Sequence, residues 1–132
     1  MKPKLYCAWF CPFAQRVWIA FEDRNIDYQY VEQDPYDKTP EWLAVNPLGL
    51  VPTIHHENRS IYESPICLEY MDDIGWTNKG EKILPGDAYL RAQQRIWGDH
   101  ISKKFTPPFY KFLMNNDLDA KQKLIESLKA CM

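Results

Sequence analysis

The spacing of apolar residues changes near residue 11, where a strand-like run gives way to a helical period. Residues 4–9 form a short run rich in apolar and aromatic side chains, which predicts a strand. Pro12 suits the first helical turn, because its fixed φ is helical and its missing N–H is not needed there. Cys11 is therefore predicted to lie at or beside the N-cap of a helix. The apolar positions that follow have the spacing of an amphipathic helix: Phe13, Val17, Ala20 and Phe21.

Later patterns predict a small mixed sheet covered by helices. Residues 27–32 alternate like a strand, and a short helix is expected over 39–45. Residues 53–56 and 60–62 are expected to be strands joined by a turn, so they should form an antiparallel hairpin. A third helix follows, with Ser64 as its expected N-cap. The order βαβ, α, ββα predicts an α/β fold of the thioredoxin-like type, with a right-handed crossover between two parallel strands.

The composition of the chain changes at residues 76–86. The stretch from Gly75 to Gly86 is polar and contains three glycines and a proline, which predicts a linker over 76–86 after a thioredoxin-like domain of residues 1–75. Residues 87–132 carry helical patterns with apolar faces, and nothing after them would complete a bundle. The sequence therefore predicts the start of an all-α domain that is incomplete.

The helices of this second domain are expected to be interrupted by prolines. A helix is predicted over 87–105, and the string Thr106-Pro107-Pro108 is expected to break it. A helical turn or two should resume over 109–115. Asp117 is expected to cap a last helix.

Composition and charge exclude several classes of function. The chain has 132 residues, of which 45% are hydrophobic and 14% aromatic, so it can form a packed core. A formal net charge of −2 gives no electrostatic reason to expect binding to nucleic acid or to an anionic membrane. Neither a membrane span nor a signal peptide is recognisable. We therefore expect a cytoplasmic protein whose thiols stay reduced.

The four cysteines do not form a recognisable pair or metal site. Cys7 and Cys11 are four residues apart, so there is no C-x-x-C motif, and an external thiol would have to resolve any disulfide on Cys11. The histidines show no ligand-like spacing with the cysteines, so no metal is expected. Cys67 is expected to be buried on a helix and inert, and Cys131 to be exposed.

Cys11 is the first candidate for chemistry. Cysteines at helix N-termini ionise more readily than ordinary ones, whose pKa is about 8.5, because the positive end of the helix dipole favours the thiolate. The thiolate is the nucleophilic form of cysteine. The alternative is a small buried hydrophobic residue, and a Cys-Pro dipeptide alone favours neither interpretation. Arg16 lies more than a helical turn after Cys11 and is interpreted as structural.

Two further features could bind a ligand. A cis Val51-Pro52 peptide bond would leave the backbone of Val51 free to pair with an extended peptide, although an ordinary trans proline opening a strand is the commoner case. Glu63 and Ser64 begin the third helix, where Ser64 and the helix amides could bind a carboxylate and Glu63 an ammonium group. Plain helix capping is the alternative for this pair.

Taken together, three strings resemble the N-terminal domain of cytosolic glutathione transferases, in particular the omega-like members that carry a cysteine. They are Phe10-Cys11-Pro12-Phe13-Ala14-Gln15-Arg16, then Pro40-Glu41-Trp42 with Asn46-Pro47-Leu48-Gly49-Leu50-Val51-Pro52, and finally Tyr62-Glu63-Ser64. The resemblance covers the glutathione-binding half of the family and only the first helices of the other half, so it implies a truncated C-terminal helical domain.

The resemblance implies a glutathione site in which glutathione is a co-substrate. By analogy, Cys11 would form a mixed disulfide with the glutathione sulfur, and the backbone of Val51, beside cis-Pro52, would pair with the cysteinyl unit. Glu63 and Ser64 would hold the γ-glutamyl group. Phe13 and Leu50 would line the site. The family often has a lysine where this chain has Thr39, and the adjacent Lys38 is the remaining candidate for a contact with the glycyl carboxylate.

The resemblance also implies the kind of reaction. Conjugating members of the family use a tyrosine or serine hydroxyl, whereas cysteine-type members carry out thiol transfer, reduction of dehydroascorbate and deglutathionylation. The expected acceptor is a small electrophile or disulfide, and the homodimer usual in the family is left open. One alternative is a non-catalytic interaction module, as found in translation elongation factor gamma subunits and aminoacyl-tRNA synthetase complexes. Another is a protein similar to chloride intracellular channels, against which the Glu63-Ser64 pair and the acidic balance argue.

Overall fold

The computed structural model of the chain describes residues 2–77 and 79–131. The chain divides into two compact units, Met1–Leu84 and Pro85–Met132, which we describe separately. The first unit holds all the residues for which a role in binding glutathione is expected, from Cys11 to Ser64.

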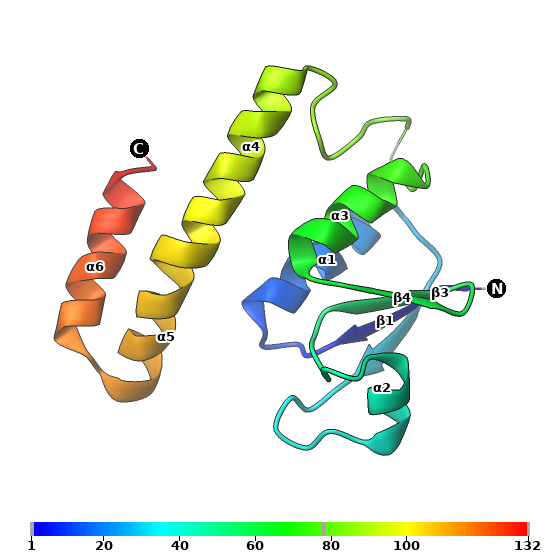
Figure 1. Cartoon of the computed structure of the whole chain (residues 1–132), viewed down its shortest axis with the longest axis horizontal. Helices are drawn as coiled ribbons and strands as arrows, with labels where there is room; N and C mark the ends of the chain where they lie inside the picture. The colour runs from blue at the N-terminus through cyan, green and yellow to red at the C-terminus, as the bar shows by residue number, and fades with distance from the viewer. Residues whose placement is uncertain (1, 78, 132) are drawn as a thin grey trace. The chain divides into compact units, whose positions relative to one another are not determined.

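The first unit is built on a four-stranded sheet in the order β2-β1-β3-β4 (Figure 1). Strands β1 and β2 are parallel, whereas β3 is antiparallel to both β1 and β4. The predicted thioredoxin-like order βαβ, α, ββα is confirmed. The elements are β1 (Lys4–Cys7), α1 (Pro12–Asp23), β2 (Gln29–Glu32), α2 (Pro40–Val45), β3 (Thr53–His56), β4 (Arg59–Tyr62) and α3 (Ser64–Asp73).

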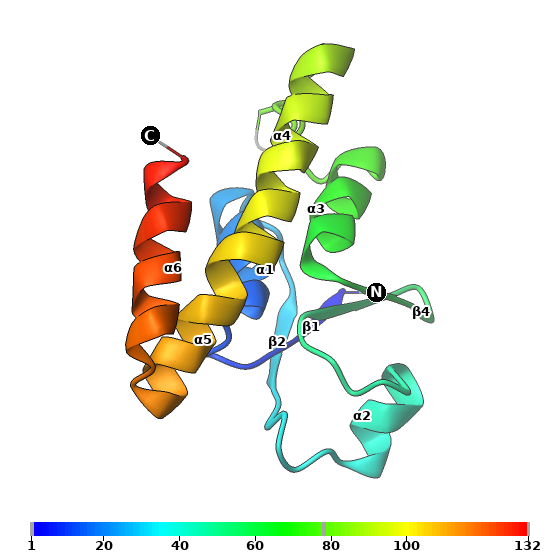
Figure 2. The same cartoon turned by 60° about the vertical axis from the view of Figure 1, so that its left-hand side comes forward.

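The core of this unit lies between the sheet and the helices α1 and α3, which pack against each other (Figure 2). Alternation along β1 places Leu5 and Cys7 on the same face, and Ile54 of β3 pairs with Leu5. All three side chains are 0% exposed. The helices cover this face with residues at helical spacing, namely Ala14, Val17, Ala20 and Phe21 of α1 and Cys67 and Met71 of α3.

Helix α2 lies on the other side of the sheet from α1 and α3 (Figures 1 and 2). It is short, and its start is fixed by local sequence. The hydroxyl of Thr39 accepts a hydrogen bond from the N–H of Trp42 at 3.2 Å, and Pro40 occupies the first turn. Trp42 is only 1% exposed, so burial of this one large side chain attaches α2 to the unit.

The start of α3 differs from the prediction. The helix begins at Ser64, and its N-cap is Glu63, which has a φ of 71° and makes no capping hydrogen bond with its side chain. Strand β4 ends at Tyr62, so a single residue has to turn the chain from the strand into the helix. A positive φ makes that turn but is not the extended conformation of a serine cap. Ser64 is consequently buried inside the first turn instead of capping it.

The second unit contains α4 (Ala88–His100), the π-helical segment η1 (Ile101–Phe105), α5 (Thr106–Asn115) and α6 (Leu118–Lys129). The predicted break at Thr106-Pro107-Pro108 is wrong, because the chain stays helical from α4 to α5. In η1 the N–H and the hydroxyl of Thr106 both donate to the carbonyl of Ile101, five residues earlier. This wider turn places the prolines in the first turn of α5, where proline is tolerated. Asp117 caps α6 as predicted, by accepting from the N–H of Ala120 at 2.9 Å.

Candidate functional site

Strand register brings three separate segments to one edge of the sheet. Tyr6 of β1 pairs with Thr53 of β3, and Thr53 in turn pairs with Tyr62 of β4. The end of β1, the start of β3 and the end of β4 therefore lie together. Cys11 follows the first of these ends, Val51 precedes the second, and Glu63 with Ser64 follows the third. Residues that are far apart in the sequence are therefore brought to the same edge of the sheet.

Cys11 is the N-cap of α1, as the sequence predicts. Its backbone N–H donates to the carbonyl of Ala8 at 2.9 Å, and its carbonyl accepts from the N–H of Gln15 at 2.9 Å. The side chain of Gln15 also donates to the carbonyl of Trp9 at 2.7 Å, so the turn before the helix is held at several points. The Cys11 thiol makes no capping hydrogen bond and is half-buried. Cys11 is therefore held in place by the backbone, and it packs against the core while staying partly exposed.

The Val51-Pro52 peptide bond is cis, which is the geometry that the family resemblance implies. Val51 is half-buried and lies outside the ladder of β3, which starts at Thr53. Within the part of the chain that the structure describes, the backbone of Val51 has no hydrogen-bond partner. An extended peptide that added to this edge could therefore use both of its polar groups.

The loop that carries Val51 is fixed by a buried asparagine. Asn46 is 0% exposed, and its side-chain amide donates to the Thr53 hydroxyl at 2.9 Å and to the Leu50 carbonyl at 3.4 Å. Its side-chain oxygen accepts from the N–H of Leu48 at 3.0 Å. The Asn46 side chain thus links the start of the loop to two residues within it and to Thr53 at its end.

Replacing Asn46 by alanine is expected to destabilise the first unit by about 2–3 kcal/mol, because the hydrogen bonds of its buried amide to Leu48, Leu50 and Thr53 would be lost together. Urea unfolding would measure the loss. The matched control is Asn115→Ala, at an exposed position in α5, where a change below about 0.5 kcal/mol is expected. A loss for Asn46→Ala as small as that of the control would mean that the loop does not depend on this amide.

The Glu63-Ser64 pair is split between the surface and the interior. Glu63 is exposed, whereas Ser64 is 3% exposed. The hydroxyl of Ser64 accepts a hydrogen bond from the guanidinium of Arg16 at 3.3 Å. The charged group and the hydroxyl expected to bind the γ-glutamyl group are therefore adjacent, and the hydroxyl already has a cationic donor.

The other residues expected to contact glutathione differ in their exposure and in the contacts that they already make. Phe13 is half-buried on α1, and the guanidinium of Arg16 lies over its ring at 5.1 Å from the centroid. Leu50 is 40% exposed in the loop before β3. The ammonium of Lys38 donates to the carbonyl of Leu48 at 3.0 Å, so its charge is tied to the same loop.

Arg16 makes a long-range contact that its place in the sequence does not predict. Its position on α1 suggested a structural role, yet its guanidinium reaches from the helix of Cys11 to the first residue of α3. Burial lowers the pKa of Arg16, while the charge of a Cys11 thiolate acts in the opposite direction. The link to Ser64 spans 48 residues of sequence, so no local pattern could have found it.

Cys7 and Cys67 differ from Cys11 in their burial. Both thiols are fully buried, and burial raises the pKa of Cys7 from 9.0 to about 11 and that of Cys67 from 9.0 to about 12. They are the wrong thiols for nucleophilic chemistry at neutral pH. Cys131 is exposed, as expected.

The raised pKa values of Cys7 and Cys67 predict a loss of stability at alkaline pH. Both thiols ionise less readily in the folded chain than in the unfolded one. Their contribution to the free energy of unfolding is therefore complete below pH 9.0, and it is lost as the pH rises through about 11 for Cys7 and about 12 for Cys67. We expect the free energy of unfolding to fall over that range. Iodoacetamide at pH 9 should label Cys7 and Cys67 in urea and leave them unlabelled in the folded chain. Equal labelling in both states would contradict the prediction.

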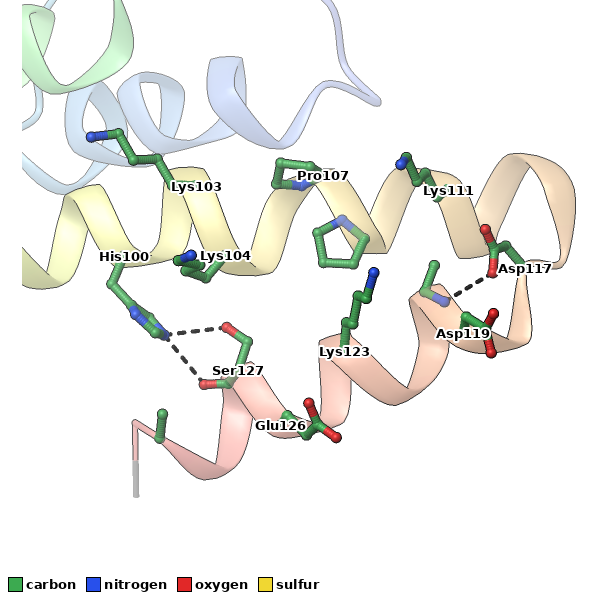
Figure 3. A pocket seen from close by; sticks show the side chains of 13 residues that line it. His100, Lys103, Lys104, Pro107, Lys111, Asp117, Asp119, Lys123, Glu126 and Ser127 are labelled. Carbon is green, nitrogen blue, oxygen red and sulfur yellow. Dashed lines mark hydrogen bonds between the residues drawn. The ribbon is translucent and has the colours of Figure 1, made fainter.

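A pocket in the second unit is lined by none of the residues expected to bind glutathione. His100 contacts Ser127 across it, with its Nε2 at 3.2 Å from the serine hydroxyl and 3.4 Å from the carbonyl (Figure 3). The charged side chains around it are of both signs: Lys103, Lys104, Lys111, Lys123, Asp117, Asp119 and Glu126. This mixture gives the pocket no clear preference for an anion or a cation.

The described residues contain neither a candidate metal site nor a membrane-spanning helix. In residues 2–77 and 79–131, no group of three or more His, Cys, Asp or Glu side chains is arranged to hold a metal ion. Within the same residues, no helix is long and apolar enough to cross a membrane.

The chain is similar to known proteins over nearly its whole length. The family described as "Glutathione S-transferase, N-terminal domain" matches residues 10–74. The probable glutathione S-transferase parC of Nicotiana tabacum is 35% identical over 125 residues, which are 92% of this chain and 56% of the relative. The chain thus spans about half the length of the curated relatives that it matches.

Two solved structures show the same fold. Glutathione transferase Omega 3C from Trametes versicolor has a TM-score of 0.86 at 35% identity, over 98% of this chain and 57% of its own. A Tau class glutathione S-transferase from mango, Mangifera indica, has a TM-score of 0.80 at 29% identity, over 95% of this chain and 56% of its own. From the matched N-terminal domain, the relatives and these structures, we conclude that the chain belongs to the glutathione S-transferase family.

Proposed function

We propose that this protein is a glutathione-dependent thiol transferase in which Cys11 is the nucleophile. The observation that carries the proposal is the position of the Cys11 thiol. It is half-buried at the N-cap of α1, beside the sheet edge that also carries Val51 and the Glu63-Ser64 pair. A thiolate there would benefit from the helix dipole and from unpaired backbone N–H groups.

The proposed reaction has two thiol–disulfide exchanges. The Cys11 thiolate attacks the glutathionyl sulfur of a mixed disulfide R–S–S–G, so that a Cys11–S–S–G bond forms and R–S⁻ leaves with the electron pair and takes a proton from water. The thiolate of a second glutathione then attacks the glutathionyl sulfur on Cys11. Oxidised glutathione forms, and the Cys11 thiolate is released. Reduction of dehydroascorbate would form the same enzyme-bound disulfide. The Cys11 thiolate would add to a carbonyl carbon of dehydroascorbate, and a glutathione thiolate would then attack the Cys11 sulfur, so that Cys11–S–S–G forms and ascorbate leaves with the electron pair of the broken carbon–sulfur bond. A second glutathione would release Cys11 as oxidised glutathione forms.

Glutathione would be held along the same edge. The free backbone groups of Val51 would pair with its cysteinyl unit in the manner of an added strand. Ser64 and Glu63 would take the carboxylate and the ammonium of the γ-glutamyl group. Phe13 and Leu50 would contact its apolar parts, and Lys38 could reach the glycyl carboxylate only by giving up the carbonyl of Leu48. Function in the cytoplasm, a small electrophile or disulfide as acceptor, and a homodimer remain part of this proposal.

The direct test is a mass measurement after incubation with oxidised glutathione. We expect one glutathione adduct that maps to Cys11, is removed by reduced glutathione, and is absent in Cys11→Ala. Cys131→Ser is the control, because its thiol is exposed but lies in the second unit. Absence of an adduct from the folded protein would refute the proposal and favour a non-catalytic interaction module of the same fold.

A second candidate is conjugation of glutathione to an electrophile, which the likeness to a Tau class transferase favours. In that reaction the glutathione thiolate attacks the electrophile, a bond forms between sulfur and carbon, and the leaving group departs with its electron pair. The protein would only have to stabilise the glutathione thiolate, so no bond to Cys11 would form. The two candidates therefore differ in whether a covalent adduct lies on the reaction path.

A further inference from the structure

Arg16 is a half-buried cation at the edge that carries the expected glutathione site. Its guanidinium donates to the Ser64 hydroxyl at 3.3 Å and lies over the Phe13 ring at 5.1 Å from the centroid. Among the residues that the structure describes, no carboxylate lies within ion-pair distance of it. A guanidinium stays protonated at neutral pH even where burial disfavours the charge. Removing a cation from water without a counter-charge costs free energy. An anionic ligand bound beside Arg16 would offset that cost.

The hydrogen bond from Arg16 also determines what Ser64 can do. A hydroxyl has one proton to donate, and its oxygen accepts. Because the oxygen of Ser64 already accepts from Arg16, its proton is free for another acceptor, and the adjacent positive charge strengthens that donation. Ser64 is 3% exposed, so the hydroxyl is screened little by water. The pair therefore presents a polarised O–H backed by a full positive charge.

We propose that Arg16 is the positioning residue of the glutathione site, which acts through Ser64 to bind the α-carboxylate of the γ-glutamyl group. The inference rests on the proposed function for the identity of the ligand. Arg16 orients the hydroxyl and supplies the counter-charge, and Ser64 makes the contact.

The experiment measures binding of S-methylglutathione, which cannot form a disulfide, to the full chain by calorimetry. Arg16→Gln is expected to weaken binding about tenfold or more, because a charge-assisted hydrogen bond is lost, and Arg16→Lys should restore part of it. Arg59→Gln is the control, since it removes the same charge from the start of β4, at the opposite end of the sheet. Amidating the α-carboxylate of the γ-glutamyl group should weaken binding to the wild type and have little effect on Arg16→Gln.

A double-mutant cycle tests whether Arg16 acts through Ser64. In a Ser64→Ala background, Arg16→Gln should cost much less than it does alone. If the wild type does not bind S-methylglutathione, both the proposed function and this inference are refuted. If the wild type binds and Arg16→Gln binds as tightly, or if Arg16→Gln loses the same factor for the acid and for the amide, only the role of Arg16 is refuted.

Discussion

Cys11→Ser is expected to lower the rate of glutathione-dependent thiol transfer by at least about 100-fold. Serine is nearly the same size and is favoured at a helix N-cap, so α1 should still begin at Pro12. The hydroxyl cannot form the mixed disulfide through which both exchanges pass. The rate would be measured with a glutathionylated peptide as substrate, by coupling the oxidised glutathione produced to its NADPH-dependent reductase.

The same variant separates the two candidate reactions. Conjugation of glutathione to an aromatic electrophile needs no bond to residue 11, so Cys11→Ser should keep or gain that activity. Cys131→Ser should leave both activities unchanged, because its thiol lies in the second unit. Thiol transfer that persisted in Cys11→Ser above a tenth of the wild-type rate would rule out Cys11 as the nucleophile.

The sequence was most informative about elements whose signals are local. The change of apolar spacing at Cys11, the cap at Thr39 and the hairpin at β3 and β4 all depend on neighbours within a few residues. The two errors arose where such a signal was overridden by its surroundings. Pro107 predicts a helix break, but the π-helical turn before it places the proline in the first turn of α5, where it is tolerated. Ser64 predicts an N-cap, but the sharp turn out of β4 makes Glu63 the N-cap instead.

The candidate site was predictable only in part, for a related reason. Cys11, Val51 and Ser64 each stand in a short motif, and strand register then brings these motifs together. Arg16 stands in a motif too, but its contact with Ser64 depends on how α1 packs against α3. Packing of two helices joins residues far apart in sequence, and no periodicity within one segment reveals which ones meet.

Asp72 is a second feature that only the fold explains. It lies in the last turn of α3, where a carboxylate opposes the helix dipole, and it is 3% exposed. One of its oxygens accepts from the N–H of Ile83 and the other from the N–H of Leu84, each at 2.8 Å. The guanidinium of Arg24 is 4.0 Å away. Asp72 thus fixes residues 83 and 84, which belong to a stretch with the composition of a linker, onto the first unit.

Replacing Asp72 by alanine is therefore expected to destabilise the first unit by about 3–5 kcal/mol. Two backbone N–H groups would lose a charged acceptor, and the buried guanidinium of Arg24 would lose its buried counter-charge while keeping its contacts with the exposed Asp23 and with the carbonyl of Glu81. Urea unfolding would measure the loss, and hydrogen exchange at Ile83 and Leu84 should accelerate. Asp73→Ala removes the same charge from the adjacent exposed position and should change stability by less than about 0.5 kcal/mol. If the two variants were equally stable, residues 83 and 84 would be held by their own packing and not by Asp72.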